Sequence, residues 1–465
     1  MILQLESLTV SHQRQKLIGP ISFGVLAGEP LVIMGETGAG KSLIAQAVMG
    51  TLPNTLTTTG KIYLNRDRID NLPINERQRL WGHSLTILPQ EPWHALDPLM
   101  PAISQVAESH RFVAGNNGER ARKNAQADFK KHSLLGAEQK RPGQLSGGMG
   151  QRVAFAAAVA GGAPLLLADE PTKGLDSDRA SEIIHSLLEV ANKGGLLVVI
   201  THDVRVASNI GGQLLVLKEG RVIESSTTHK ILASPQRTYT QTLIQAEPKH
   251  WDKTQTTANA TTLLETKQLI VGREGKAMSP AIDLQLRKGQ RIAITGPSGV
   301  GKSTFLDTIA SLVKPIAGNI ALSPQIGPTD IQKLYQDPPA SFPSSISLKQ
   351  SLDDVSKLHQ ISWPNIRLLL TKLKIDMDIL QRKPDAVSGG ELQRIAIARA
   401  LSVKPMLVLA DEPTSRLDPI TQKETMNLLA DVARKNNTAV LLVTHDKAMA
   451  QKWAESTLAL SMVDT

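Results

Sequence analysis

"GETGAGKS" occupies residues 35–42, and "GPSGVGKS" occupies residues 296–303. Both stretches have the spacing G-x-x-x-x-G-K-S, and each follows a short apolar run that is typical of a buried strand. In a loop of this form the backbone N–H groups curl around phosphate oxygens, and the helix that begins at the lysine turns its positive end toward the same anion. The sequence therefore predicts two phosphate-binding loops.

The motifs that follow each loop come in the same order in both halves. They read "LPQEP", "LSGGMGQR", "LLLADEPT" and "THD" in the first half, and "LYQDP", "VSGGELQR", "LVLADEPT" and "THD" in the second. The serine of SGG precedes the aspartate of ADEPT by 23 residues in both halves, at 146 to 169 and at 388 to 411. Two homologous domains explain this repeat.

The composition limits the class of protein. A chain of 465 residues is too long for one ordinary domain, and 41% apolar with 20% charged residues is typical of a soluble globular protein. The absence of cysteine excludes disulfides, thiolate zinc sites and iron–sulfur clusters. No apolar run reaches the roughly 18 to 20 residues of a membrane helix, and the N-terminus does not resemble a signal peptide, so we expect no membrane span. The net charge of +9 suits a nucleotide, a nucleic acid or an anionic membrane surface and does not choose among them.

We expect an α/β fold with two tandem domains, each built on a mostly parallel sheet. Continuous apolar runs such as "PLLLAD", "LLVVIT", "MLVLAD" and "AVLLVT" are typical of strands buried on both faces. Residues 102–140 and 348–382 break this alternation and are predicted to form a helical subdomain in each half. We place the first domain at 1–245 and the second at 263–465. Residues 246–262 are polar and rich in Thr and Ala, and are predicted to be a flexible linker.

The loop lysines and serines have separate expected roles. Lys41 and Lys302 can reach the β- and γ-phosphates of a nucleotide, and the Ser42 and Ser303 hydroxyls can bind Mg²⁺. Either loop alone could be a glycine turn with a surface lysine, but the other motifs argue against this interpretation. The residues expected to bind nucleotide are Gly35, Glu36, Thr37, Gly38, Ala39, Gly40, Lys41, Ser42 and Leu43 in the first loop, and Gly296, Pro297, Ser298, Gly299, Val300, Gly301, Lys302, Ser303 and Thr304 in the second.

An acidic pair ends one apolar strand in each half. Asp169 and Asp411 occupy the position from which a carboxylate can hold Mg²⁺. Glu170 and Glu412 follow at once and could activate a water molecule as general bases. A solvated strand end is the simpler interpretation of either pair alone, but the neighbouring phosphate loop favours the catalytic one.

Two further polar side chains follow strands in each half. Gln90 and Gln336 could reach both Mg²⁺ and the attacking water, and His202 and His445 stand just after a strand in "THD". Each would more often be an ordinary loop residue if it occurred alone. Their repeated spacing favours a catalytic role for all four.

The SGG segments form a second kind of anion-binding surface. Gly-Gly followed by a helical run makes an open helix N-terminus, which attracts negative charge. Each half therefore carries two phosphate-seeking helix ends, although one nucleotide needs only one loop. The residues concerned are Ser146, Gly147 and Gly148, and Ser388, Gly389 and Gly390.

The ordered set of phosphate loop, glutamine, SGG signature, DEPT and histidine resembles the ATP-binding cassette (ABC) family, over nearly the whole chain. The resemblance implies ATP and Mg²⁺ as cofactors, and an antiparallel β part beside each parallel sheet. It also implies that two cassettes pair head to tail as an internal pseudo-dimer, with one ATP between each loop and the opposite signature. The first site would combine Lys41, Ser42, Gln90, Asp169, Glu170 and His202 with Ser388, Gly389 and Gly390. The second would combine Lys302, Ser303, Gln336, Asp411, Glu412 and His445 with Ser146, Gly147 and Gly148.

Some positions depart from the family pattern. Met149 stands in the first signature where the family usually has Gln or Glu, and Arg416 stands where a small residue is usual after DEPT. Adenine normally stacks on an aromatic side chain in this family. Here the nearest candidates are His12 and Arg273, so base stacking is expected to be weak.

The stretches "MGETGAGKSLIAQAVMGTLP", "LPQEPWHALDPLM" and "SPQRTYTQTLI" look like the oligopeptide, dipeptide and nickel importer ATPases. This resemblance implies a subunit at the cytoplasmic face of the inner membrane. It would energise uptake of a peptide, nickel or metal-chelate solute through two membrane permease subunits and an extracytoplasmic solute-binding protein. Trp93 would lie where such permeases dock, or would pack inside the helical subdomain.

A soluble twin-cassette ATPase that acts on ribosomes or nucleic acid is the alternative. Proteins of that kind usually carry a long charged linker between the cassettes. The stretch at 245–262 is neither long nor strongly charged, so no nucleic-acid partner is expected.

Overall fold

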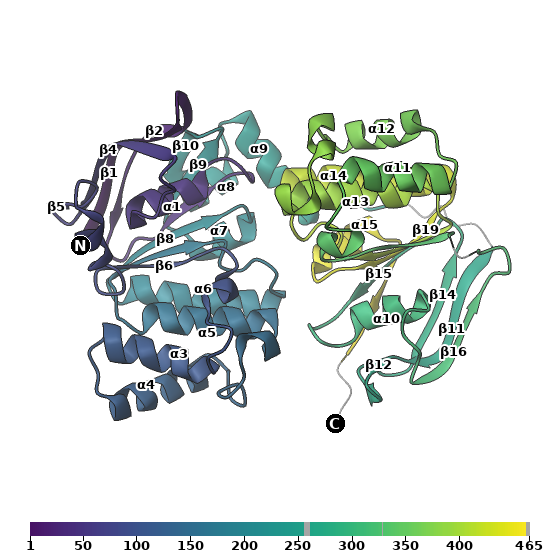
Figure 1. Cartoon of the computed structure of the whole chain (residues 1–465), viewed down its shortest axis with the longest axis horizontal. Helices are drawn as coiled ribbons and strands as arrows, with labels where there is room; N and C mark the ends of the chain where they lie inside the picture. The colour runs from purple at the N-terminus through teal and green to yellow at the C-terminus, as the bar shows by residue number, and fades with distance from the viewer. Residues whose placement is uncertain (255–260, 328, 462–465) are drawn as a thin grey trace. The chain divides into compact units, whose positions relative to one another are not determined.

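Each half of the chain folds around its own parallel sheet in the computed structural model (Figure 1). The structure describes residues 1–254, 261–327 and 329–461. It divides into a first unit, Met1–Ile244, and a second unit, Gln245–Thr465. Among the described residues no helix is long and apolar enough to cross a membrane.

The first unit contains two sheets. In the larger one the strand order is β10-β9-β3-β8-β7-β6, with β10 antiparallel to β9 and the other neighbours parallel. The smaller sheet has the order β2-β1-β4-β5 and is antiparallel. The strands are β1 (Ile2–His12), β2 (Gln15–Leu26), β3 (Leu31–Met34), β4 (Leu56–Leu64), β5 (Asp67–Arg68), β6 (Leu85–Leu88), β7 (Leu165–Asp169), β8 (Leu196–Thr201), β9 (Gln213–Lys218) and β10 (Arg221–Thr227).

The helices of the first unit connect these strands. The predicted helical subdomain is present as α3, η2 and α4, which lie together with α5 beside the sheet (Figure 1). The helical elements are α1 (Lys41–Met49), α2 (Ile74–Gln78), η1 (Pro92–Ala95), α3 (Ala102–Glu108), η2 (Ser109–Val113), α4 (Gly118–Lys131), η3 (Pro142–Gln144), α5 (Gly147–Val159), α6 (Ser177–Asn192), α7 (Val204–Ile210), α8 (Thr228–Ala233) and α9 (Thr238–Gln245).

The second unit repeats this plan. Its parallel sheet has the order β17-β18-β19-β15-β20, and the antiparallel part consists of β14-β11-β16 and the hairpin β12-β13. The strands are β11 (Thr262–Ile270), β12 (Gly272–Arg273), β13 (Lys276–Ala277), β14 (Ile282–Arg287), β15 (Arg291–Thr295), β16 (Ala317–Leu322), β17 (Ile331–Leu334), β18 (Leu407–Asp411), β19 (Ala439–Val443) and β20 (Ser456–Ala459).

The helices of the second unit again follow the strands and the loop. They include the predicted subdomain between 348 and 382, which the structure builds from α11, α12 and η6. The helical elements are η4 (Pro248–His250), α10 (Lys302–Ile309), η5 (Pro338–Ser341), α11 (Leu348–Leu358), α12 (Trp363–Lys372), η6 (Met377–Gln381), η7 (Pro384–Ala386), α13 (Gly389–Ser402), α14 (Pro419–Asn436) and α15 (Lys447–Trp453). The α/β architecture expected from the sequence is confirmed in both units.

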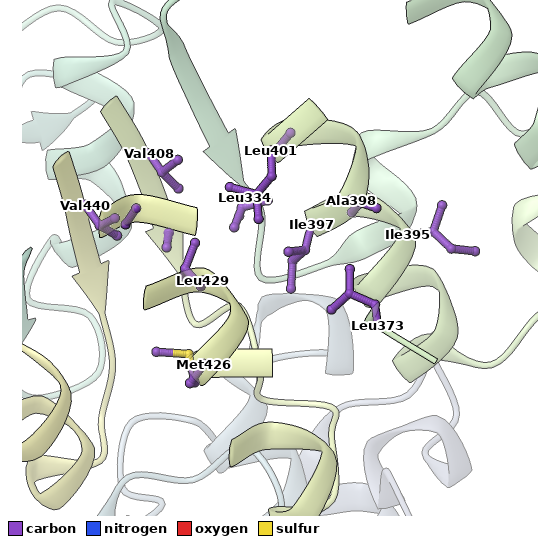
Figure 2. Packing of buried hydrophobic residues seen from close by; sticks show 14 of the residues in the cluster. Leu334, Leu373, Ile395, Ile397, Ala398, Leu401, Val408, Met426, Leu429 and Val440 are labelled. Atoms are coloured by element: carbon purple, nitrogen blue, oxygen red, sulfur yellow. The ribbon is translucent and has the colours of Figure 1, made fainter. Parts of the chain in front are cut away.

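Each parallel sheet is buried on both faces, as its apolar strands predict. In the second unit, β11 and α10 cover one face. Figure 2 shows the other face, where Val408 and Val440 of the sheet lie near Met426 and Leu429 of α14. In the first unit, α1 packs in one core with β1, β4 and the large sheet. The loop and the first turn of α1 or α10 are therefore fixed at the carboxyl end of a rigid sheet.

The predicted linker differs from the expectation in its first part. Trp251 is only 5% exposed, lies in the core of the second unit, and donates from Nε1 to the carbonyl oxygen of Ala246 at 2.7 Å. Thr254 bonds through its backbone N–H and its hydroxyl to the carbonyls of Lys452 and Trp453, at 2.9 and 3.0 Å. Residues 245–254 thus belong to the second unit. The surrounding residues are polar, but the side chain of Trp251 is buried in the core of that unit. Residues 255–260 lie outside the described part of the chain.

Candidate nucleotide site

The two glycine loops share the backbone conformation of the glycine that precedes the lysine. Gly40 and Gly301 have φ angles of 89° and 90°, in the left-handed region where a side chain is strained. A Cβ on Gly40 would also lie 2.1 Å from Cγ2 of Ile18. The helices that follow, α1 and α10, begin without a side-chain cap, so their first N–H groups face the loop and can bind an anion.

Each loop lysine is held by the carbonyls of its own loop. Lys41 Nζ donates to the carbonyl oxygens of Gly35 and Glu36, both at 2.8 Å. Lys302 Nζ donates to those of Gly296 and Pro297, also at 2.8 Å. Both lysine side chains are buried, so each ammonium is fixed beside the helix N-terminus where a phosphate would bind.

The strand-end aspartates reach the loop serines. Burial raises the pKa of Asp169 to about 6, against the neighbouring Ser42 side chain, which lowers it. Burial also raises the pKa of Asp411, and the Ser303 side chain lowers it. In the described part of the chain, Oδ1 of each aspartate is buried without a hydrogen-bond partner.

These paired oxygens fit Mg²⁺. A serine hydroxyl and an unpartnered carboxylate oxygen are hard ligands, and Mg²⁺ commonly takes one or two protein ligands while phosphates and water complete its shell. Consistent with so small a protein contribution, no cluster of three or more His, Cys, Asp or Glu side chains suited to a metal occurs among the described residues.

The two glutamates occupy an unusual backbone conformation. Glu170 and Glu412 have φ angles of 49° and 45°, in the left-handed region that non-glycine residues rarely adopt. Their backbone N–H groups still continue the sheet, because they donate to the carbonyls of Ile200 and Val443 at 2.8 and 3.0 Å. Strain that recurs at the same position in both units is typical of functional residues.

In the first unit Glu170 pairs with the histidine that follows β8. Nδ1 of His202 lies 2.6 Å from Oε1 of Glu170, and Thr201 Oγ1 donates to Oε2 at 3.3 Å. Burial alone would raise the pKa of Glu170, but His202 holds it below its usual value. Burial likewise acts to lower the pKa of His202, and Glu170 raises it. The carboxylate is therefore ionised at neutral pH and can accept a proton or a hydrogen bond from water.

In the second unit Glu412 lies between two predicted residues. Nδ1 of His445 lies 3.3 Å from Oε2 of Glu412, and Gln336 Nε2 donates to the same oxygen at 3.1 Å. Burial raises the pKa of Glu412, whereas the hydrogen bond and charge of His445 outweigh it and hold the pKa below its usual value. The structure thus brings together four predicted side chains at each strand end, and in the second unit the glutamine joins them.

The SGG serines cap their helices in different ways. Ser146 accepts a hydrogen bond from the backbone of Met149 at 3.3 Å. Ser388 forms a full capping box with Glu391, whose carboxylate accepts from the serine backbone at 2.9 Å and from its hydroxyl at 2.7 Å. Gly147 and Gly389 follow as the first helical residues, so each SGG segment presents an open helix end.

Two buried glutamines were not predicted as site residues. Gln151 donates from Nε2 to the carbonyl oxygen of Pro171, next to Glu170. Gln393 donates from Nε2 to the carbonyl oxygen of Glu412 at 3.4 Å. Each ties a signature helix to the acidic turn of its own unit. The sequence did contain a signal for these two residues, because Gln-Arg occurs at the same distance after SGG in both halves.

Other predicted residues stand at the edge of these clusters. Gln90 is exposed two residues after β6, and His12 is exposed at the end of β1. Nη2 of Arg273 lies 3.1 Å from a carboxylate oxygen of Asp307. The backbone of Trp93 lies in η1, which packs against α5, and its side chain is outside the described part.

Comparisons with known proteins agree with this geometry. The family model described as "ABC transporter" matches residues 18–173 and 280–415, which is more than half of the chain. The peptidoglycan transport ATP-binding protein YejF of Agrobacterium fabrum is 29% identical over 95% of this chain and 86% of its own length. The glutathione import ATP-binding protein GsiA of Escherichia coli strain K12 is 29% identical over 97% and 83%.

Solved structures are similar in fold. A model of ribosome-bound archaeal Pelota and ABCE1 contains a chain that matches 98% of this one with a TM-score of 0.72. The matched part covers 78% of that chain at 22% identity. At this identity the likeness concerns the fold alone.

Proposed function

The chain belongs to the ABC transporter family, whose ATP-binding domains hydrolyse ATP, and on that premise we propose that it is the ATPase subunit of an importer. One observation carries the ATPase part of the proposal: both units gather a loop lysine, a serine and an aspartate, and a glutamate–histidine pair at the end of the parallel sheet. A protein that only bound nucleotide would not need two complete sets.

The phosphate side of each site follows from the loop. Backbone N–H groups of the loop and the helix N-terminus cradle the β- and γ-phosphates, and Lys41 or Lys302 adds a positive charge. Ser42 with Asp169, and Ser303 with Asp411, would hold Mg²⁺, with Gln90 and Gln336 as further ligands. Bound there, the ion neutralises charge on the phosphates during transfer.

The water side of each site follows from the glutamates. Glu170 and Glu412 are held ionised by His202 and His445, so each can orient a water molecule and accept its proton. Each glutamate directly follows the aspartate proposed to bind Mg²⁺, in a left-handed backbone conformation. Gln336 already bonds to Glu412 and can align the same water.

Each ATP would be closed by the signature of the opposite unit. A loop supplies one side, and an open helix end with a serine hydroxyl can supply the other. On this arrangement Ser388, Gly389 and Gly390 complete the first site, and Ser146, Gly147 and Gly148 complete the second. The presence of one of each in a single chain supports an internal head-to-tail pair.

The import role is supported by the relatives and by sequence motifs. The two relatives reported above are named for peptidoglycan transport and for glutathione import, and glutathione is a small peptide. We therefore propose a peptide-type solute that enters through two membrane permease subunits supplied by an extracytoplasmic binding protein. The ATPase would lie peripherally on the inner face of the membrane, with Trp93 near the permease contact.

Reconstitution tests this proposal. The full chain would be co-expressed with the permease genes adjacent to its own, purified from membranes, and placed in proteoliposomes with the partner binding protein. We expect ATP-dependent uptake of a labelled di- or tripeptide, and its loss in the Glu170→Gln, Glu412→Gln double variant. If the chain co-purifies with ribosomes or nucleic acid and does not associate with the permeases, the import proposal is wrong and the soluble twin-cassette alternative is favoured.

A further inference from the structure

A tyrosine from the end of the first unit contacts the phosphate loop. Tyr239 lies in the first turn of α9, and its hydroxyl oxygen accepts a hydrogen bond from the backbone N–H of Glu36 at 2.9 Å. These two residues are 203 positions apart in the chain. The contact therefore brings a segment from beyond the last β-strand of the unit onto the nucleotide loop.

This hydrogen bond acts on the same peptide group as Lys41. The N–H of Glu36 and the carbonyl of Gly35 belong to one peptide unit, and Lys41 Nζ donates to that carbonyl at 2.8 Å. A hydrogen bond to one end of a peptide group polarises it and strengthens the bond at the other end. The Tyr239 hydroxyl is thus connected through a single planar group to the ammonium that faces the phosphates.

The tail that carries Tyr239 is fixed to the body of the unit. Backbone N–H groups of Gln236 and Arg237 donate to the Glu224 carboxylate at 2.8 and 3.3 Å. Leu243 of α9 is completely buried, and Lys218 Nζ lies 5.3 Å from the centre of the Tyr239 ring. A side chain held in this way can determine where a loop peptide lies.

The second unit provides a natural comparison. Pro297 occupies the position of Glu36, and proline has no backbone N–H to donate. Lys302 nonetheless bonds to both loop carbonyls at 2.8 Å. The second loop therefore holds its lysine without an N–H at this position, and in the first unit that N–H donates to Tyr239.

We propose that Tyr239 is a positioning residue for the first ATP site, acting through the Gly35–Glu36 peptide on Lys41. This inference rests on the proposed function, because it assigns to the tyrosine a part in ATP binding. The hydroxyl fixes the peptide whose carbonyl aligns the lysine, so the loop is preorganised for phosphate before nucleotide arrives. The second loop achieves this through the fixed φ angle of Pro297 instead.

The test compares the two loops within one protein by amide hydrogen exchange. In Tyr239→Phe the ring remains and only the hydroxyl is lost. We expect faster exchange in a peptide that contains Glu36, and roughly two- to tenfold weaker protection of that loop by Mg²⁺ with a non-hydrolysable ATP analogue. The loop at 296–304 should keep its affinity, and unchanged exchange in 238–245 would verify that α9 remains folded.

Substitutions at Glu36 make the test specific. Glu36→Pro removes the donor and copies the second loop, so adding Tyr239→Phe should have no further effect. Glu36→Ala loses the carboxylate but keeps the N–H, so adding Tyr239→Phe should weaken binding as it does in the natural chain. An equal loss from Tyr239→Phe in both backgrounds would overturn the inference.

The outcomes separate the inference from the function on which it rests. Equal protection of the first loop in the natural chain and in Tyr239→Phe would overturn the role of the tyrosine while leaving ATP binding intact. If the analogue protects neither loop in the natural chain, the proposed ATPase function itself fails.

Discussion

The two units surround the same proposed site residues with different charged side chains. Five residues after the loop lysine, the first unit has Gln46 and the second has Asp307. Three residues before the glutamine that we propose as a site residue, the first has Ile87 and the second has Lys333. The lysine, aspartate, glutamate and histidine beside them are identical in type. The proposed site residues are therefore the same in the two units, while the charges around them differ.

The second unit uses these positions for an ion cluster. Asp307 pairs with Lys333 and with Arg273, and the Lys333 side chain is only 8% exposed. Lys333 also lies 4.7 Å from the ring centre of Tyr335. Burial raises the pKa of Asp411, the charge of Lys333 opposes that rise, and Asp307 adds to it more weakly, so the cluster acts on the carboxylate that we propose binds Mg²⁺.

The largest expected effect tests whether the two sites are equally competent. Replacing both general bases, in Glu170→Gln with Glu412→Gln, should slow ATP hydrolysis by about 10²- to 10⁴-fold, because an amide cannot accept the proton. Either single variant should retain hydrolysis at the other site in a single-turnover assay with limiting ATP. Nucleotide binding, measured separately, should persist in all three variants.

If Glu170→Gln alone abolishes hydrolysis while Glu412→Gln does not, the similarity of the two clusters is misleading. The second site would then not hydrolyse ATP by itself, and turnover would depend on the first site.

The sequence predicted those parts of the comparison that depend on local pattern. Apolar runs placed the parallel strands, and glycine and lysine spacing placed both loops. Each acidic pair could be placed at a strand end, because the aspartate is the last residue of an apolar run and the glutamate follows it directly. The positive φ angles of Glu170 and Glu412 follow from a sharp turn that no propensity marks, since glutamate ordinarily avoids this conformation.

Contacts between distant segments could not be predicted in this way. Asp307 and Lys333 lie in different elements, and each alone is compatible with an exposed face. Trp251 occurs in a polar stretch, and only the tertiary structure provides the core position that it fills. Tyr239 and Glu36 meet because the tail after β10 returns to the loop. Such pairings depend on topology, which local spacing does not encode.

The ion cluster of the second unit gives the next effect. Asp307→Gln alone leaves Lys333 buried without its carboxylate, and should lower the free energy of unfolding by about 3 kcal/mol. Adding Lys333→Ile installs both residues of the first unit and should restore stability to within about 1 kcal/mol of the natural chain. Calorimetry of the full chain measures both.

The first unit serves as an internal reference for that measurement, because its melting transition should not move. A double variant that is as unstable as Asp307→Gln would contradict this account. In that case, attraction between Asp307 and Lys333 would not be the main contribution of these two side chains to stability.

The pH dependence of Mg²⁺ binding should differ between the loops. The pKa of Asp169 is raised to about 6, and a protonated carboxyl cannot ligate Mg²⁺. Below that pH, the Mg²⁺ concentration needed to protect the first loop should therefore increase, by up to about tenfold per pH unit. Burial also raises the pKa of Asp411, but Lys333 lowers it by more than Asp307 raises it, so the second loop should lose protection at lower pH.

Exchange of the two loop peptides measures both dependences in one sample, and titration of the nucleotide phosphate affects both alike. The Asp307→Gln, Lys333→Ile variant should move the midpoint of the second loop toward that of the first. Identical midpoints in the natural chain would remove the proposed role of the cluster.

The smallest expected effect concerns the signature helices. Glu391 closes a capping box on Ser388, whereas Met149 occupies the same place after Ser146. Glu391→Met should lower the local stability of the first turn of α13 by about 0.5 to 1 kcal/mol, and Met149→Glu should raise that of α5 by a similar amount. Amide exchange at the start of each helix checks both changes.

The same swap separates the capping role of Glu391 from a role in ATP closure. The Ser388 hydroxyl donates to Glu391 at 2.7 Å. In the composite site that we propose, it would have to release that carboxylate before it could donate to a phosphate. Glu391→Met removes the competing acceptor, so closure on the first ATP should become easier even though the helix end is less stable. If hydrolysis at the first site falls in proportion to the lost stability, Glu391 acts as a cap alone. If hydrolysis is maintained or increases, the glutamate restrains the serine, and the two signatures differ in how readily they release a hydroxyl to the nucleotide.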